Sequence, residues 1–105
     1  MLWNISHEQD KRITKQSGWL ALNSHIFLIG VPNSPVIYIF KKKNNEVIHV
    51  GFDNQGDLLK SMRNDILGGK GYLATQFKWM AVASKQHPEK FYKELCKYYF
   101  KQHGS

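Results

Sequence analysis

Two short apolar runs separated by a polar turn form the clearest pattern in the chain. Residues 36–40 (VIYIF) and 47–51 (VIHVG) are rich in β-branched and aromatic side chains, which favour strands. The residues between them are polar, and their Asn44-Asn45 step suits a tight turn. We therefore predict a β-hairpin over residues 36–51.

A capping pattern predicts a helix near the start of the chain. Ser6 is followed three residues later by Gln9, which matches a capping box. A short helix should therefore run from Ser6 to about Gln16 and be ended by Gly18. Residues 25–29 are expected to form a short strand or a buried loop.

After the hairpin the pattern predicts a helix, a strand and a second helix. Asp57 is a suitable N-cap for a helix over residues 58–67. Residues 75–83 (TQFKWMAVA) have the composition of a third strand, and Pro88 suits the first turn of a last helix that ends near residue 103. This order favours one layer of sheet covered by helices, in the α/β or α+β class.

Length, cysteine content and net charge indicate the number of domains, the cellular location and the kind of partner. With 105 residues the chain has room for one domain, and no apolar run approaches the ~18–20 residues that span a bilayer. Residues 1–10 lack the pattern of a signal peptide and Cys96 is the only cysteine, so we expect a cytoplasmic, reducing location and no membrane partner. The net charge of +7 favours polyanions, nucleic acid first, although solubility alone also accounts for such a charge.

The hairpin and its approach resemble the GIY-YIG nuclease superfamily. Tyr38 stands in the first strand as in the Gly-Ile/Val-Tyr motif, and Gly51 ends the second strand as in the Tyr-Ile/Val-Gly motif. Residues 31–35 (VPNSP) look like the Leu-Pro-x-x-Pro lead-in of excision-repair members of that family. Two positions depart from the motifs: Val36 replaces the first Gly, and His49 replaces the second Tyr.

The resemblance covers residues 31–103, with residues 1–30 as an N-terminal helix and lead-in. It implies a small three-stranded, mainly antiparallel sheet flanked by helices. It also implies phosphodiester hydrolysis in which a Tyr acts as general base, an Arg neutralises charge on the phosphate and a Glu holds a divalent metal. Tyr38 and His49 are the candidate proton-transfer residues, expected side by side, and each has a purely structural alternative as a packed or solvent-facing strand residue.

The other two catalytic positions of the family are changed. The match places Ser61 where the family has Arg, and Arg63 could substitute only if the helix were rotated or shifted in register. It places Tyr92 where the family has the metal-binding Glu. Glu89 is the better candidate for a relocated Mg²⁺ ligand than Glu94, and the alternative is that no metal site exists.

Clustered basic residues suggest a nucleic-acid-binding surface. Four lysines recur on one face of the last predicted helix, where they could follow a phosphate backbone or form an ordinary solvated face. The full set of candidates is Lys41, Lys42, Lys43, Lys60, Arg63, Lys70, Lys90, Lys93, Lys97 and Lys101.

Three hypotheses follow from these residues. The favoured one is a GIY-YIG-like domain that binds DNA or RNA and has lost most or all cleavage activity. The second is a Mg²⁺-dependent endonuclease that uses Tyr38, His49, Arg63 and either Glu89 or Glu94 in a displaced geometry. The third is a protein-interaction module that kept only the fold.

Overall fold

The predicted hairpin forms the centre of the structure. In the computed structural model, which describes residues 1–22 and 31–100, strand β3 spans Val36–Lys41 and pairs antiparallel with strand β4 at Val47–Asp53. The turn between them places Asn45 in the left-handed region at φ 72°, a conformation that Asn tolerates better than most residues. The hairpin prediction is thus confirmed.

Within residues 1–22 and 31–100 the sheet has five strands, all antiparallel, in place of the three expected. Its order is β1-β5-β3-β4, and β2 also pairs with β5. Strand β5 spans Gln76–Val82, as predicted, while β1 (Ile13–Gln16) and β2 (Leu20–Ala21) come from the N-terminal segment. The α+β class is confirmed, and the strand count is corrected because the N-terminal segment extends the sheet along the free edge of β5.

The predicted N-terminal helix to Gln16 is wrong. Only Ile5–Gln9 forms a short 3-10 helix, η1, and its N-cap is Asn4, whose side chain accepts a hydrogen bond from the Ser6 N–H. The residues after it instead pair with β5, so their backbone groups form hydrogen bonds within the sheet. A helix of this length without packing partners would be only marginally stable. The expected strand or buried loop at 25–29 lies outside the described residues.

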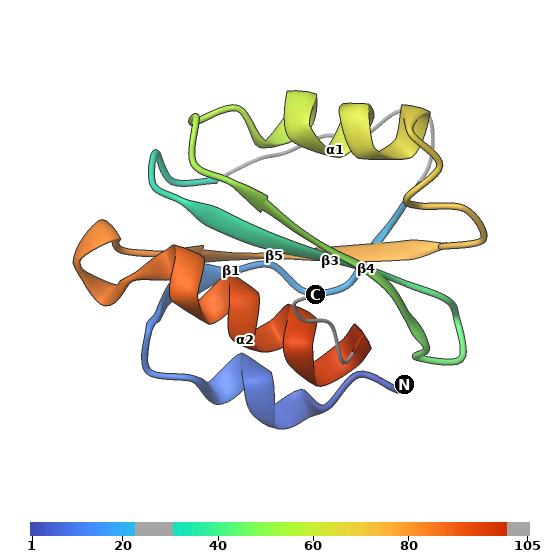
Figure 1. Cartoon of the computed structure of the whole chain (residues 1–105), viewed down its shortest axis with the longest axis horizontal. Coiled ribbons are helices and arrows are strands. Elements are labelled where there is room, and N and C mark those ends of the chain that lie inside the picture. Colours follow the sequence, from blue (N-terminus) through green and yellow to red (C-terminus); the bar gives the residue numbers. More distant parts are fainter. Residues whose placement is uncertain (23–30, 101–105) are drawn as a thin grey trace.

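In the described part of the chain, two α-helices cover opposite faces of the sheet (Figure 1). Helix α1 spans Leu58–Leu67 with Asp57 as its N-cap, which accepts from the Lys60 N–H at 3.1 Å, as predicted. Helix α2 spans Pro88–Phe100 after a short 3-10 turn, η2, at Ser84–Gln86. The described part of the chain holds no helix with the length and apolar character that a membrane crossing requires.

Each face of the sheet has its own core, because alternate residues of the central strand β3 point to opposite sides. The core on the α1 side consists of Val36, Tyr38, Phe40, Leu58, Met62, Phe77, Trp79 and Ala81. The core on the α2 side consists of Ile37, Ile39, Val47, Val50, Met80, Val82, Phe91, Leu95 and Tyr99, with Trp3 and Trp19 packed against it. Strand β3 is buried throughout, which explains its unbroken apolar sequence.

Candidate functional site

The hairpin places Tyr38 and His49 on the same face of the sheet, under α1. Phe40 pairs with His49 across the two strands, and Tyr38 lies two residues before Phe40, so the three rings share one side. The ring centroids of Tyr38 and His49 are 6.2 Å apart. The expected juxtaposition of a phenol and an imidazole is therefore present.

Gly51 makes room for the Tyr38 ring. The two residues pair directly across the strands, and a Cβ added at Gly51 would overlap the ring carbons and hydroxyl of Tyr38. This close approach explains why a glycine stands at position 51. Its cause is a neighbouring side chain, since Gly51 has no positive φ.

Asp65 of α1 joins the two rings. Its Oδ2 atom accepts a short hydrogen bond from the Tyr38 hydroxyl and lies 2.8 Å from Nε2 of His49. Because a carboxylate oxygen accepts and does not donate, both rings donate to the same atom. Asp65 was not among the residues predicted from the sequence. The available signal was its i, i+4 spacing from Ser61, which puts the two on the same face of α1.

The three side chains form one wall of a shallow polar pocket of about 360 Å³. It lies at β4, the edge strand of the sheet, and receives residues from both helices. Phe52 and Tyr92 close it from the α2 side, with their rings stacked at 5.3 Å between centroids. The lining is completed by Gly51, Ser61, Asn64 and Lys70.

Two residues matched to changed catalytic positions lie in this pocket. Ser61 stands where the resemblance places Arg, and Tyr92 where it places the metal-binding Glu. The Ser61 hydroxyl donates to Asp53 at 2.8 Å and so fixes α1 to the end of β4. Arg63 is exposed on α1 and does not line the pocket, so the structure does not bring it together with Tyr38 and His49.

Both phenols of the pocket hold their protons firmly. Burial is the main cause that raises the pKa of Tyr38 above its ordinary 10.0, and the hydrogen bond and charge of Asp65 add to it. Burial, with Cys96 and Asp65 as lesser causes, raises the pKa of Tyr92 to about 12. Tyr38 is therefore a hydrogen-bond donor at neutral pH, and this geometry does not support its expected role as a general base.

The residues of the pocket do not fit a Mg²⁺ site. Asp65 is the single carboxylate among its lining residues, and it already accepts from two rings. Glu89, the expected ligand, is exposed on α2 and pairs with Lys93 at 3.1 Å, outside the pocket. Among residues 1–22 and 31–100 there is no group of three or more His, Cys, Asp or Glu side chains able to hold a metal.

The predicted basic surface separates into different environments. Lys41 is buried, with its Nζ 4.1 Å from the Trp19 ring centroid, and burial lowers its pKa. The prediction that Lys41 binds a phosphate is therefore wrong, because its ammonium group is not accessible. Lys70 lines the pocket. Lys42 pairs with Glu46 at 3.7 Å, while Lys43 and Lys60 are exposed.

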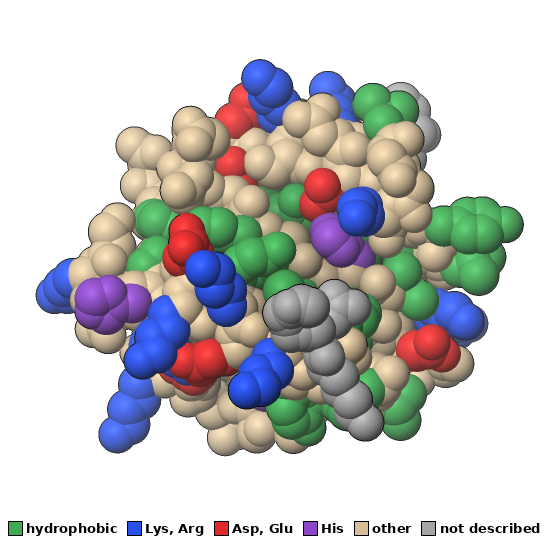
Figure 2. All heavy atoms as spheres, viewed as in Figure 1, with side chains coloured by type: hydrophobic (Ala, Val, Ile, Leu, Met, Phe, Trp, Pro, Cys, Tyr) green, Lys and Arg blue, Asp and Glu red, His purple; other side chains and the backbone are tan. Residues whose placement is uncertain are grey.

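The lysines of α2 are mixed with acidic residues. Lys90, Lys93 and Lys97 line a separate shallow depression together with Glu89 and Glu94. Glu94 also pairs with Arg12 at 2.9 Å. Figure 2 shows the resulting mixture of positive and negative side chains over α2. Lys101, the fourth lysine of the predicted stripe, lies outside the described residues.

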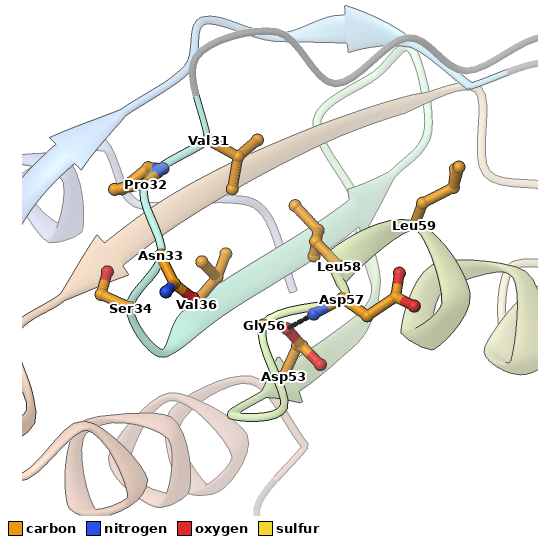
Figure 3. A pocket seen from close by; sticks show the side chains of 10 residues that line it. All are labelled: Val31, Pro32, Asn33, Ser34, Val36, Asp53, Gly56, Asp57, Leu58 and Leu59. Atoms are coloured by element: carbon orange, nitrogen blue, oxygen red, sulfur yellow. Dashed lines mark hydrogen bonds between the residues drawn. The ribbon is translucent and has the colours of Figure 1, made fainter.

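A larger depression of about 540 Å³ lies at the start of α1 (Figure 3). Its walls are apolar residues of the lead-in and of α1, such as Pro32 and Leu58, together with the carboxylates of Asp53 and Asp57. Asp53 is buried and accepts from the Asp57 N–H at 3.0 Å, so it organises the loop before α1. Carboxylates make this depression a poor place for a phosphate.

No family model, no curated protein and no solved structure matches this chain.

Proposed function

We propose that this protein is a nucleic-acid-binding domain resembling the GIY-YIG nucleases, in which cleavage is weak or lost. The observation that carries the proposal is the pocket at β4, where Tyr38, His49 and Lys70 lie within one lining. The pocket receives a phosphate of the nucleic-acid backbone. The order of hairpin, helix, strand and helix agrees with the fold that the resemblance implies.

The charges and donors of the pocket suit a backbone phosphate. Lys70 supplies a positive charge, and the Asn64 amide supplies a neutral donor. The Asp65 carboxylate is already engaged, since its Oδ2 atom accepts from the Tyr38 hydroxyl and from His49. The net charge of +7 adds a long-range attraction for a polyanion, which raises the rate of encounter.

The same pocket lacks the groups that accelerate phosphodiester hydrolysis in the family. Ser61 and Tyr92 occupy the positions of the Arg and the Glu, and Tyr38 keeps its proton. Loss of one transition-state-stabilising group costs about 10²–10³ in rate, and here two are replaced. Binding without efficient cleavage is therefore the function that these residues support best.

The binding part is tested by fluorescence anisotropy with labelled duplex DNA and single-stranded RNA, from about 50 to 200 mM salt. We expect wild-type affinity to fall steeply with salt. Lys70→Ala should weaken binding at low salt and reduce the slope of log affinity against log salt by about one, because one phosphate contact is lost. Lys85→Ala, at an exposed lysine of η2 outside the pocket, is the matched control. Absence of binding to either ligand at low salt would contradict the proposal and favour the protein-interaction module.

The cleavage part is tested by nicking of supercoiled plasmid with Mg²⁺ or Mn²⁺. We expect wild type and Tyr38→Phe to give the same background. Nicking by wild type that is abolished in Tyr38→Phe would overturn this part and support the endonuclease hypothesis.

A further inference from the structure

Three exposed apolar side chains lie at the end of α1 and in the loop that follows it, a segment whose Lys70 lines the pocket. Leu67 at the end of α1 is 86% exposed, and Tyr72 and Leu73 in the loop that follows are 74% and 60% exposed. Figure 2 shows hydrophobic side chains projecting from the molecule at this loop. Large apolar side chains left this exposed within one short segment make the segment a candidate binding surface.

The loop is fixed to the body of the protein despite this exposure. The Lys70 N–H donates to the Asp65 carbonyl at 2.9 Å, and the Ala74 N–H donates to the Gly71 carbonyl at 2.9 Å. Gly71 packs against the ring of Phe40, where an added Cβ would lie 3.2 Å from a ring carbon. The apolar side chains are thus held in position toward the solvent by a hydrogen-bonded backbone.

The backbone at Leu73 is strained. Its φ is 71°, in the left-handed region that is unfavourable for a residue with a γ-branched side chain. Strain of this kind persists where the surrounding structure imposes it, and it is common at binding sites. Here it holds an exposed leucine, so no gain from core packing offsets the strain.

Charge indicates which partner this surface fits. Lys70 belongs both to the loop and to the lining of the pocket, so the apolar side chains adjoin the proposed phosphate contact. A ligand that combines an anionic backbone with a flat apolar surface is a nucleic acid with an unpaired base.

We propose that the loop from Leu67 to Leu73 binds an unpaired nucleobase next to the phosphate held in the pocket. Tyr72 stacks on the base, and Leu67 and Leu73 contact its edges. This inference rests on the proposed function and adds a ligand preference to it: bulged or single-stranded sites bind more tightly than continuous duplex, in which the base faces are stacked and inaccessible.

The test compares a blunt duplex with the same duplex carrying one bulged adenine, by fluorescence anisotropy. Wild type should bind the bulged duplex more tightly. Tyr72→Ala should weaken binding of the bulged duplex by roughly 5- to 100-fold, and that of the blunt duplex by less than about 2-fold. Tyr72→Phe keeps the ring and should bind as wild type does. The matched control is Ile5→Ala, at a side chain of η1 that is 69% exposed.

A second variant separates recognition from stability. Leu73→Gly removes the strain at φ 71°, so the folded protein should be at least as stable as wild type. It also removes a side chain that contacts the base, so the preference for the bulged duplex should fall. A purely structural loop would give the same gain in stability with an unchanged preference, which overturns the inference.

The outcomes distinguish this inference from the proposed function. If wild type binds the bulged and the blunt duplex equally, and Tyr72→Ala binds both as wild type does, the base-binding loop is overturned and the phosphate pocket is left intact. Absence of binding to any nucleic acid at low salt overturns both. If Tyr72→Ala instead lowers self-association or binding to anionic vesicles while duplex preference is unchanged, the loop serves another partner and the inference is overturned.

Discussion

Phe91 and Leu95 of α2 pack on an apolar core that the N-terminal residues Trp3 and Trp19 cover from outside. On the other face, α1 packs over Tyr38 and His49, and its Asp65 binds both rings. Both faces bury polar groups: on the α2 side Lys78 is buried and donates to the Ser17 carbonyl, whereas the polar groups on the α1 side open into a pocket at β4. The comparison indicates that the α2 face stabilises the fold and the α1 face carries the site.

The largest difference is expected from truncation of matched leucines. Leu95 on α2 and Leu58 on α1 are 2% and 4% exposed. Leu95→Ala should cost about 3–4 kcal/mol, because it leaves a closed cavity. Leu58→Ala should cost about 2–3 kcal/mol, because Leu58 already lines an open depression. Urea unfolding measures both, and a larger cost for Leu58→Ala would reverse this view of the two faces.

An intermediate effect is expected at the glycine that makes the site possible. In Gly51→Ala the new methyl group overlaps the Tyr38 ring, so the ring must move and its bond to Asp65 weakens. We expect a loss of about 2–3 kcal/mol in the free energy of unfolding. Gly18→Ala is the matched control, since an added Cβ there meets nothing within 4 Å, and it should change stability by less than about 0.5 kcal/mol. Equal stability of the two variants would show that the contact at Gly51 is not restrictive.

Elements that depend on local signals could be predicted from the sequence, and elements that depend on distant contacts could not. The hairpin, the bounds of α1 and the start of α2 were predictable, because turn residues, the Asp57 N-cap and Pro88 are local signals. Strand β1 was not, because its residues are ordered by the distant edge of β5. Local capping preferences were outweighed there by sheet pairing.

The site was predictable in part for the same reason. The register of a hairpin fixes which residues face the same side, so the juxtaposition of Tyr38 and His49 followed from the pattern. Asp65 depends on the phase of α1 relative to the hairpin, and Lys41 depends on Trp19 from a remote segment. Neither relation is contained in the local sequence.

The smallest effects concern alkaline pH, where a tyrosine on each face can be compared. Burial raises the pKa of Tyr99, on the α2 side, to about 12, and it also raises the pKa of Tyr38, on the α1 side, above its ordinary 10.0. Above pH 10 the unfolded chain loses phenolic protons that the folded protein keeps. The stabilisation is therefore complete below about pH 10 and is lost as pH rises.

Each tyrosine should contribute a slope of about 1.4 kcal/mol per pH unit to this loss. For Tyr99 the slope should end near pH 12, where its folded form also ionises. Urea unfolding of wild type, Tyr99→Phe and Tyr38→Phe between pH 9 and 12 isolates these contributions from the lysines, which titrate in the same range in all three proteins. Each variant should show a shallower fall than wild type. A Tyr38→Phe curve parallel to wild type would mean that the phenol is not buried against Asp65, and the polar character of the α1 face would then have to be explained without it.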